Sequence, residues 1–395
     1  MRKKTKKIMV EMGKIIISYM AKLFFLPFHI LTIKQNRIIF TSLIAKKDSA
    51  YSCNPKYIFE YLRDRHDDTY EIIWAFEEPK NYLFLKQQNV QLVKHLSLKS
   101  LFYLMTARVI VTNGTNVLWI PFRKGQIVIN TWHGGGAYKR LIIGTGYMKR
   151  LIEKRYIIAG QNTTLFVSSS RTFSHNVIRD VFHFQGSILE VGMPRNDILL
   201  RHSHYDIIEK VQNHYELDKK MNILLYAPTY RDTGNYTPLN ISRIIHFLME
   251  VTEKDWVCLV RFHYLGCEKT DLCQNHNQII NAGNYPDMQE LLIAANLMIT
   301  DYSSSIWDYS LLEKPCFLYV PDLKKYQKVR GFDTDINNWC MPYAEDEDAL
   351  LNLLAQMDTI DWHENAKKHH SSLGSYETGH AAEAIGQYID NICNS

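Results

Sequence analysis

The chain has 395 residues, of which 46% are hydrophobic and 22% charged, so it is long enough for two domains and has the composition of a globular protein. Its seven scattered cysteines form no Cys-x-x-Cys pair, which argues against a zinc site or a disulfide scaffold and favours a reducing, cytoplasmic setting. The net charge of +5 is concentrated in residues 1–34, which carry eight basic residues against one glutamate. The rest of the chain is close to neutral and shows no nucleic-acid footprint.

Residues 1–34 have the pattern of a basic amphipathic helix. Polar side chains recur at steps of three or four and share one helical stripe: Lys7, Glu11, Lys14, Ser18 and Lys22. Most other positions before Pro27 are apolar, so the pattern predicts a helix lying in the plane of an anionic membrane surface. A helix packed on the protein body is the main alternative. A spanning helix or signal peptide is disfavoured, because lysines interrupt the apolar run and no small-residue cleavage site follows it.

Beyond residue 35, short β-rich runs alternate with helical stretches in two series. The first series predicts strands at 37–41, 71–75, 90–93, 109–112, 127–129, 165–167 and 188–191. The second predicts strands at 222–226, 257–260, 278–280, 297–299 and 316–319. Apolar strands separated by helices are typical of parallel sheets covered on both faces. The predicted fold class is therefore α/β, in a GT-B arrangement of two Rossmann-like domains facing a cleft, preceded by the amphipathic helix.

The predicted organisation has three parts. Residues 1–34 form the membrane-associating segment, 35–205 the N-terminal Rossmann-like domain and 206–395 the C-terminal one. We place the joint in the polar stretch 201–221, which separates the two strand series. The last part of the chain, from about Asp346, has a helical pattern.

The strongest local signal is a serine-rich turn that follows the strand at 297–299. Ser303, Ser304 and Ser305 lie between that strand and a helical pattern closed by Pro315. Backbone N–H groups at a helix start, together with hydroxyl donors, predict a phosphate site at the carboxyl end of a strand. The alternative is ordinary capping, in which Ser305 caps the helix and Asp308 closes a Ser-x-x-Asp capping box. The two readings are compatible.

A second signal is the glycine-rich run that follows the strand at 127–129. His133 lies at the end of that strand, where α/β folds place catalytic groups, and an imidazole there can accept a proton from an attacking hydroxyl. Gly134 and the two glycines after it allow a ligand to approach the backbone closely. Lys139 and Arg140 can meet negative charge. A purely structural histidine is the alternative.

Cations also follow two strands of the second series. Thr229 and Arg231 lie at the exit of the strand at 222–226. Strand alternation places Arg261 and His263 on one face, where a cation and an imidazole could meet a pyrophosphate together. An ordinary strand exit and a satisfied surface pair are the alternatives.

Other motifs are ambiguous when they are read alone. Arg195 and Asp197 lie in the turn 192–197, and Arg330 precedes a Gly-Phe-Asp sequence. No His-Glu-x-x-His, Gly-x-Ser-x-Gly, P-loop or Asp-x-Asp signature stands out, so metalloprotease, α/β-hydrolase and Walker ATPase functions lose support.

Taken together, these motifs resemble the CDP-glycerol glycerophosphotransferase family, whose members build teichoic acids and related glycerol-phosphate polymers. The matching pieces run through most of the chain after the N-terminal segment: Tyr51–Lys56, Thr131–Gly134, Gly192–Asp197, Tyr226–Thr229, Arg261–His263, Thr300–Ser304 with Asp308, and Tyr326–Phe332. The Trp-His-Gly and Thr-Asp-Tyr-Ser-Ser motifs in this order are specific.

The resemblance implies a GT-B fold, a CDP-linked donor in the C-terminal domain, an acceptor in the N-terminal domain, and no metal or cofactor. It also implies peripheral attachment to the cytoplasmic face of the membrane through the N-terminus. His133 would be the catalytic base, and His263 would assist at the donor phosphates. One departure is visible. The form associated with the glycerophosphate polymerases has Thr-Pro after Trp-His-Gly, whereas Gly135 and Gly136 follow here, so we expect a different acceptor side.

The expected reaction is attack of an acceptor hydroxyl on the β-phosphorus of CDP-glycerol, with release of CMP. The donor-binding residues are predicted to be Thr229, Arg231, Arg261, Asp301, Ser303, Ser304, Ser305, Asp308 and Arg330. Residues that contact or position the acceptor are predicted to be Gly134, Lys139, Arg195 and Asp197. The expected acceptor is a lipid-linked sugar or a growing glycerol-phosphate polymer of the teichoic-acid or capsule type, and the short N-terminal segment favours limited addition.

Three alternatives stay open at this point. Within the family, CDP-ribitol could replace CDP-glycerol as the donor. A GT-B glycosyltransferase that uses a nucleotide-sugar would fit the fold but not the motifs. A membrane-bound scaffold that binds CDP-glycerol without turnover would fit the motifs but is not an enzyme.

Overall fold

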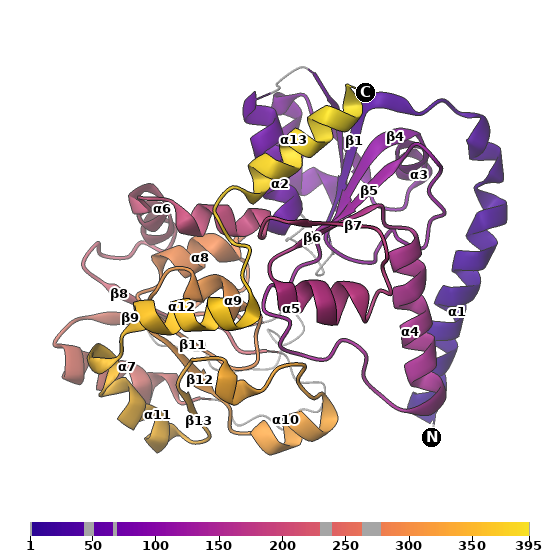
Figure 1. Cartoon of the computed structure of the whole chain (residues 1–395). Coiled ribbons are helices and arrows are strands. Elements are labelled where there is room, and N and C mark those ends of the chain that lie inside the picture. Colours follow the sequence, from indigo (N-terminus) through magenta and orange to yellow (C-terminus); the bar gives the residue numbers. More distant parts are fainter. Residues whose placement is uncertain (1, 43–50, 66–68, 230–238, 263–277, 395) are drawn as a thin grey trace. The chain divides into compact units, whose positions relative to one another are not determined.

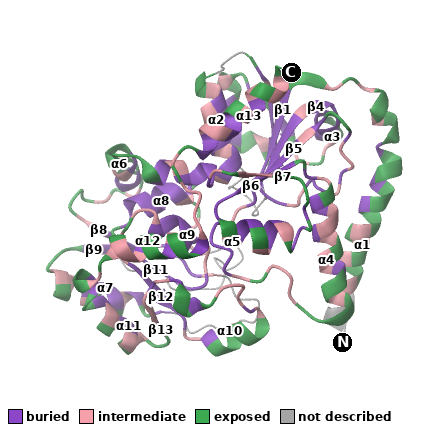
Figure 2. Cartoon of the chain, in the orientation of Figure 1, coloured by how far each residue is buried: buried purple, intermediate pink, exposed green. Residues whose placement is uncertain are grey.

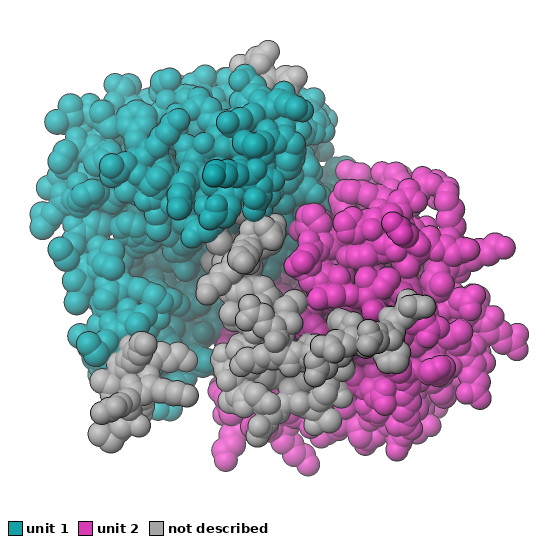
Figure 3. Space-filling view, turned by 180° about the vertical axis from the view of Figure 1, so that it is seen from behind, with its two compact units in different colours: residues 1–133, 141–197, 376–395 teal, residues 134–140, 198–375 magenta. Residues whose placement is uncertain are grey.

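The computed structural model describes residues 2–42, 51–65, 69–229, 239–262 and 278–394. The chain divides into two compact units, coloured separately in Figure 3. Unit 1 comprises residues 1–133, 141–197 and 376–395, and unit 2 comprises residues 134–140 and 198–375. Each unit has one parallel sheet covered by helices, as in the Rossmann-like architecture that the sequence predicts.

In the described part of unit 1, a seven-stranded sheet has the order β3-β2-β1-β4-β5-β6-β7, and every neighbouring pair is parallel. Its strands are β1 (Lys34–Thr41), β2 (Glu71–Phe76), β3 (Gln91–Lys94), β4 (Ala107–Thr112), β5 (Ile127–Asn130), β6 (Leu165–Ser168) and β7 (Ser187–Glu190). The α-helices are α1 (Arg2–Phe24), α2 (Cys53–Arg65), α3 (Leu98–Thr106), α4 (Gly146–Gln161), α5 (Arg171–Phe173) and α13 (Ala381–Cys393). Short helical segments are η1 (Leu26–Ile30), η2 (Pro79–Gln88), the π-helical η3 (Ser174–Arg179) and η4 (Pro194–Leu200), which crosses into unit 2.

One core cluster of unit 1 lies between the sheet and helices α2 and α13 and combines aliphatic with stacked aromatic side chains. Trp74 of β2 stacks on Phe40 of β1 at 5.2 Å and on Phe76 at 5.1 Å between ring centroids. Ile385 and Ile389 of α13 join the same cluster, although they come from the end of the chain. The C-terminal helix is therefore part of the first unit's core.

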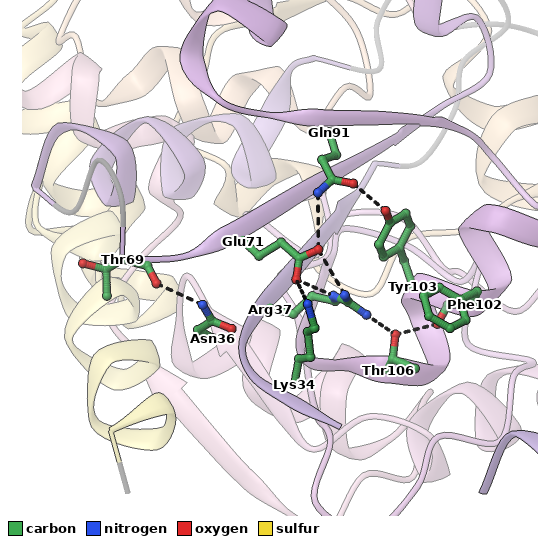
Figure 4. Close-up of polar contacts among 9 residues, drawn as sticks. All are labelled: Lys34, Asn36, Arg37, Thr69, Glu71, Gln91, Phe102, Tyr103 and Thr106. Atoms are coloured by element: carbon green, nitrogen blue, oxygen red, sulfur yellow. Dashed lines mark hydrogen bonds and ion pairs between the residues drawn. The ribbon is translucent and has the colours of Figure 1, made fainter. Parts of the chain in front are cut away.

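At the amino-terminal edge of this sheet, a buried cation fixes β1, β2 and α3 together (Figure 4). Arg37 donates to both carboxylate oxygens of Glu71 at 2.9 and 3.0 Å, and also to the hydroxyl of Thr106. Its guanidinium lies over the ring of Tyr103 at 4.9 Å. Burial opposes ionisation of Glu71, but hydrogen bonds from Arg37 and Lys34 outweigh that effect, so the pKa of Glu71 lies below its ordinary value.

Helix α1 lies beside α4 in unit 1 (Figure 1), and it turns part of its polar stripe inward. Glu11 forms an ion pair with Arg155 of α4 at 3.4 Å, and Ser18 is buried. Much of α1 is exposed (Figure 2). Its exposed apolar side chains include Met20 and Leu23, which are 63% and 72% exposed. Within the residues that the structure describes, no helix is long and apolar enough to cross a membrane.

In the described part of unit 2, a six-stranded parallel sheet has the order β10-β9-β8-β11-β12-β13. Its strands are β8 (Asn222–Tyr226), β9 (Trp256–Val260), β10 (Ile279–Asn281), β11 (Leu297–Thr300), β12 (Cys316–Tyr319) and β13 (Tyr343–Ala344). The α-helices are α6 (Tyr205–His214), α7 (Ile241–Thr252), α8 (Met288–Ala294), α9 (Ser305–Ser310), α10 (Leu323–Val329), α11 (Glu347–Leu354) and α12 (Trp362–Leu373). Two short 3-10 segments are η6 (Ile336–Asn338) and η7 (Met357–Thr359). Apolar side chains of α7 and α11 pack with this sheet in one core.

The units do not follow a simple division of the chain at residue 205. Unit 2 resumes at Ile198, and the chain returns to unit 1 at Tyr376. The segment Gly134–Arg140, which we call the strap, follows a strand of unit 1 but belongs to unit 2. These exchanges depend on contacts between residues far apart in sequence, which a pass along the chain does not reveal.

Candidate active site

The strand order of unit 2 creates a switch point between β8 and β11. The connections leave these neighbouring strands in opposite directions, and ligands of open α/β sheets bind at the carboxyl ends of such strands. Thr229 follows β8 and Asp301 follows β11. Both carboxylate oxygens of the buried Asp301 accept the backbone N–H of Thr229 at 3.0 Å, and one also accepts the N–H of Tyr302. Asp301 therefore fixes the exits of two strands relative to each other.

The serine turn follows Asp301 directly. Ser303 and Ser304 are half-buried, whereas Ser305 is buried. The hydroxyl of Ser303 accepts the backbone N–H of Ser305 at 3.2 Å and its hydroxyl at 2.9 Å. Two partly exposed hydroxyls thus lie at the switch point, where a diphosphate oxygen could reach them.

The predicted capping box is wrong. Helix α9 starts at Ser305 with Ser304 as its N-cap, and the Ser304 side chain makes no capping hydrogen bond. Asp308 is buried, and its carboxylate accepts the side-chain amide of Gln289 in α8 at 3.0 Å. Asp308 therefore ties α9 to α8, because a partner outside the local sequence takes its carboxylate.

The strap lies against this turn. A Cβ placed on Gly134 would be 3.7 Å from the Cβ of Ser304. The backbone carbonyl of Tyr138 accepts the N–H of Asp333 at 2.9 Å, and the N–H of Arg140 donates to the carbonyl of Gly331 at 3.3 Å. Unit 2 thus holds the chain immediately after His133 next to the serine turn.

Cationic side chains lie in the strap itself and in the segment of unit 2 that it contacts. Lys139 is half-buried and its backbone pairs with that of Phe332 in an isolated antiparallel β-bridge, and the exposed Arg140 lies 3.7 Å from Asp333. Arg330 is half-buried, and in the described part of the chain its Nε is enclosed without a hydrogen-bond partner. A buried guanidinium N–H without a partner is costly, so Arg330 is suited to meeting an anion.

Arg261, which follows β9, already uses part of its hydrogen-bonding capacity within the protein. Its guanidinium donates to the backbone carbonyls of Ala282 at 2.8 Å and Tyr285 at 2.6 Å. These bonds hold the loop that follows β10. Arg231 and His263, the other two cationic or imidazole candidates of this unit, lie outside the described residues.

In unit 1, His133 lies near that sheet's own switch point between β1 and β4. Its Nδ1–H donates to the carbonyl of Asn113, which follows β4, at 2.8 Å. In a neutral imidazole this bond leaves Nε2 as the proton acceptor. The ring is half-buried and packs on Trp132 at 4.4 Å between centroids. His133 is therefore held in the tautomer that a general base needs.

The backbone before His133 is strained, and side chains from other elements hold it. Trp132 has φ of 51°, in the left-handed region that bulky residues avoid. Its N–H donates to the side chain of Asn130 at 2.9 Å, and its carbonyl accepts the side-chain amide of Asn54 in α2 at 3.0 Å. Asn54 is absent from the site residues that the sequence predicts. The signal that could have found it is its place in the family-like piece Tyr51–Lys56.

Arg195 and Asp197 form hydrogen bonds to backbone and side-chain groups of unit 1. The buried guanidinium of Arg195 donates to the carbonyl of His133 at 2.8 Å, and its backbone N–H donates to Asn54 at 3.2 Å. The carboxylate of Asp197 accepts the N–H groups of Ala381 at 3.0 Å and Ala382 at 2.7 Å, which start α13. The turn 192–197 therefore supports His133 on one side and the C-terminal helix on the other.

Metal ligands do not gather in this region. Among the residues that the structure describes, no group of three or more His, Cys, Asp or Glu side chains is placed to hold a metal ion.

Comparisons with known proteins all point to the same family. The family model described as CDP-Glycerol:Poly(glycerophosphate) glycerophosphotransferase matches residues 23–391. A teichoic acid poly(glycerol phosphate) polymerase of Bacillus spizizenii is 30% identical over 84% of this chain and 86% of its own length. A teichoic acid glycerol-phosphate transferase of Staphylococcus aureus is 28% identical over 90% of this chain and 93% of its own length.

Two further matches bear on length and fold. The polymerase of Bacillus subtilis is 29% identical over 91% of this chain, but the chain spans only about half, 49%, of that relative's length. A structure of the wall teichoic acid polymerase TagF soaked with CDPG superposes with a TM-score of 0.82 at 26% identity, over 100% of this chain and 98% of that one. This match confirms the predicted fold class, a GT-B-type pair of Rossmann-like units with a helix at the N-terminus.

Proposed function

Because the chain belongs to the CDP-glycerol:poly(glycerophosphate) glycerophosphotransferase family, we propose that it transfers glycerol phosphate from CDP-glycerol to an acceptor hydroxyl and releases CMP. The acceptor is a lipid-linked sugar or a growing glycerol-phosphate polymer at the membrane. The observation that carries the proposal is the imidazole of His133, which the carbonyl of Asn113 holds in one tautomer. The main chain after His133 continues directly into the strap, whose first residue lies beside Ser304.

In the proposed step the acceptor oxygen bonds to the β-phosphorus while the bond from that phosphorus to the CMP oxygen breaks. Nε2 of His133 takes the hydroxyl proton, since Nδ1–H is engaged by the carbonyl of Asn113. Phosphoryl transfer leaves little covalent chemistry for the protein, so positioning and charge stabilisation supply most of the rate.

The donor diphosphate is proposed to lie at the switch point of unit 2. Ser303, Ser304 and Thr229 offer side-chain hydroxyl donors, and Arg330 offers a cation whose Nε has no hydrogen-bond partner in the described part of the chain. The carboxylates of Asp301 and Asp308 already accept hydrogen bonds from the protein, so we propose that they hold the surrounding backbone and helices in place and do not contact the donor. The contribution of Arg231 and His263 to the donor phosphates stays a prediction.

The test replaces the base alone. His133→Ala should lower kcat by roughly 10² to 10⁴, the usual contribution of a general base, while CDP-glycerol binds nearly as before. Turnover is followed as CMP release, and binding by calorimetry. His202→Ala, which removes an exposed histidine outside the proposed site, is the matched control and should turn over normally. A His133→Ala enzyme with wild-type kcat would rule out the base assignment.

The N-terminal helix is proposed to hold the protein on the cytoplasmic face of the membrane. Its outward apolar face, with Met20 and Leu23, and its lysines have the composition of a helix that lies in an anionic interface. That placement would bring the enzyme to a lipid-linked acceptor. Leu23→Glu should reduce pelleting with anionic liposomes while CMP release with a soluble acceptor persists. Unchanged pelleting of this variant and of a chain lacking residues 1–34 would contradict the proposal.

A further inference from the structure

The strap begins at Gly134, the residue directly after the proposed base, His133. The chain leaves unit 1 after His133, and the next residue, Gly134, belongs to unit 2. Whatever fixes the strap inside unit 2 therefore fixes one end of the peptide that carries the imidazole. The backbone bonds to Gly331 and Asp333 are one fastening. Two histidines of α12 provide another, and the proposed chemistry does not use them.

The first fastening side chain is Tyr138, which is only 2% exposed. Its hydroxyl is hydrogen-bonded to Nε2 of His369 at 2.6 Å, and its ring packs on Trp339 at 4.5 Å between centroids. Burial raises the pKa of Tyr138 well above its ordinary value and lowers the pKa of His369 to about 3, so both groups are neutral at physiological pH. Nδ1 of His369 has no hydrogen-bond partner among the described residues, so the bond to Tyr138 is its polar anchor there.

The second fastening is the indole of Trp307, which faces Gly135. Trp307 is fully buried and packs on the ring of His370 at 4.3 Å between centroids. His370 in turn is bonded at Nε2 to the hydroxyl of Ser310 at 2.8 Å. The adjacent histidines of α12 thus support both aromatic rings that hold the strap.

These rings give a packing reason for the two glycines that depart from the family pattern. A Cβ on Gly135 would lie 2.1 Å from the indole of Trp307, and a Cβ on Gly136 would lie 2.1 Å from the ring of Tyr138. Neither position can carry a side chain while both rings are in place. Glycines and rings therefore form one complementary set within unit 2.

We propose that Tyr138 and His369 are positioning residues, which clasp the strap within unit 2 and so fix the main chain that continues directly from the His133 base. This inference rests on the proposed function. The clasp does not touch the donor, so its loss should lower kcat and leave the KM for CDP-glycerol unchanged. It acts through His133, so it should have no further effect once that base is absent.

The test uses Tyr138→Phe, which keeps the ring and removes the hydroxyl. We expect kcat to fall roughly tenfold with the KM for CDP-glycerol within twofold of wild type, because a small misplacement of a reacting group is costly. Tyr309→Phe, which removes another buried tyrosine hydroxyl in the same unit, is the matched control and should keep its kcat. His369→Gln, which can still bond the hydroxyl, should retain more activity than His369→Leu.

Hydrogen exchange of the strap amides gives a second readout that does not depend on turnover. Tyr138→Phe should accelerate exchange in residues 134–140, and Tyr309→Phe should not. Normal kcat and unchanged strap exchange in Tyr138→Phe would overturn the clasp. If wild-type protein releases no CMP from CDP-glycerol, the proposed function fails instead. In that case, faster strap exchange in Tyr138→Phe would show that the clasp holds the strap. The claim that the clasp positions a catalytic base would be refuted.

Discussion

Replacing Gly135 by alanine tests the strap with the smallest possible change. The added Cβ would sit 2.1 Å from an indole carbon of Trp307, where ordinary contacts begin at 3.4 Å. Trp307 is fully buried against His370 and has no room to retreat, so the strap must move instead. The required shift is roughly 1 Å, and a misplacement of that size typically costs about 100-fold in rate.

The expected result for Gly135→Ala is therefore a kcat about 100-fold lower, equal to about 2.7 kcal/mol in activation free energy. CMP release at saturating CDP-glycerol measures it, with thermal unfolding recorded in parallel. Gly13→Ala is the control, because a Cβ there meets no atom within 4 Å. A Gly135→Ala enzyme with wild-type kcat and melting temperature would refute the reasoning, because the strap would then have tolerated a clash that the packing forbids.

Three further predictions concern stability. Arg37→Ala should lower the free energy of unfolding by about 3 kcal/mol, because it leaves the carboxylate of Glu71 without its buried partner; a loss below about 1 kcal/mol in urea unfolding would contradict this. Asp197→Ala should cost about 1–2 kcal/mol through loss of the cap on α13, and proteolysis of the C-terminal helix should report it. Burial lowers the pKa of His369 to about 3 and that of His370 to about 4, from about 6.5 when unfolded. The unfolded chain therefore binds more protons below about pH 6.5, so stability should fall on acidification, by up to about 1.4 kcal/mol per pH unit for each histidine. Replacing His370 by Gln should reduce that slope, and an unchanged slope would contradict its assignment as a buried neutral group.

The sheets could be predicted from the sequence because their strands are buried, apolar and separated by helices. Every predicted strand occurs within a few residues of its expected bounds. Strand β13 was missed, since Tyr343–Ala344 is too short to show a pattern. Helix α9 also ends at Ser310, earlier than its closing signal at Pro315 indicates. The family resemblance rests on specific motifs, and the match over residues 23–391 confirms it.

The features that could not be predicted from the sequence depend on contacts between residues far apart in the chain. His133 could be found because a histidine between a strand and a glycine run is a local pattern. Tyr138 and His369 are 231 residues apart, so nothing local joins them. The capping box failed for the same reason, because Gln289 takes the carboxylate of Asp308. The N-terminal helix was predicted as amphipathic, but partners on α4 draw part of its polar stripe inward.

The central claim is the transfer of glycerol phosphate with release of CMP, and a donor panel tests it most directly. Purified protein is incubated with a lipid-linked or glycerol-phosphate acceptor and with CDP-glycerol, CDP-ribitol or a UDP-sugar in turn. We expect CMP from CDP-glycerol in step with glycerol phosphate added to the acceptor, and loss of both in His133→Ala. Release of UDP from a UDP-sugar, or faster CMP release from CDP-ribitol than from CDP-glycerol, would contradict the account.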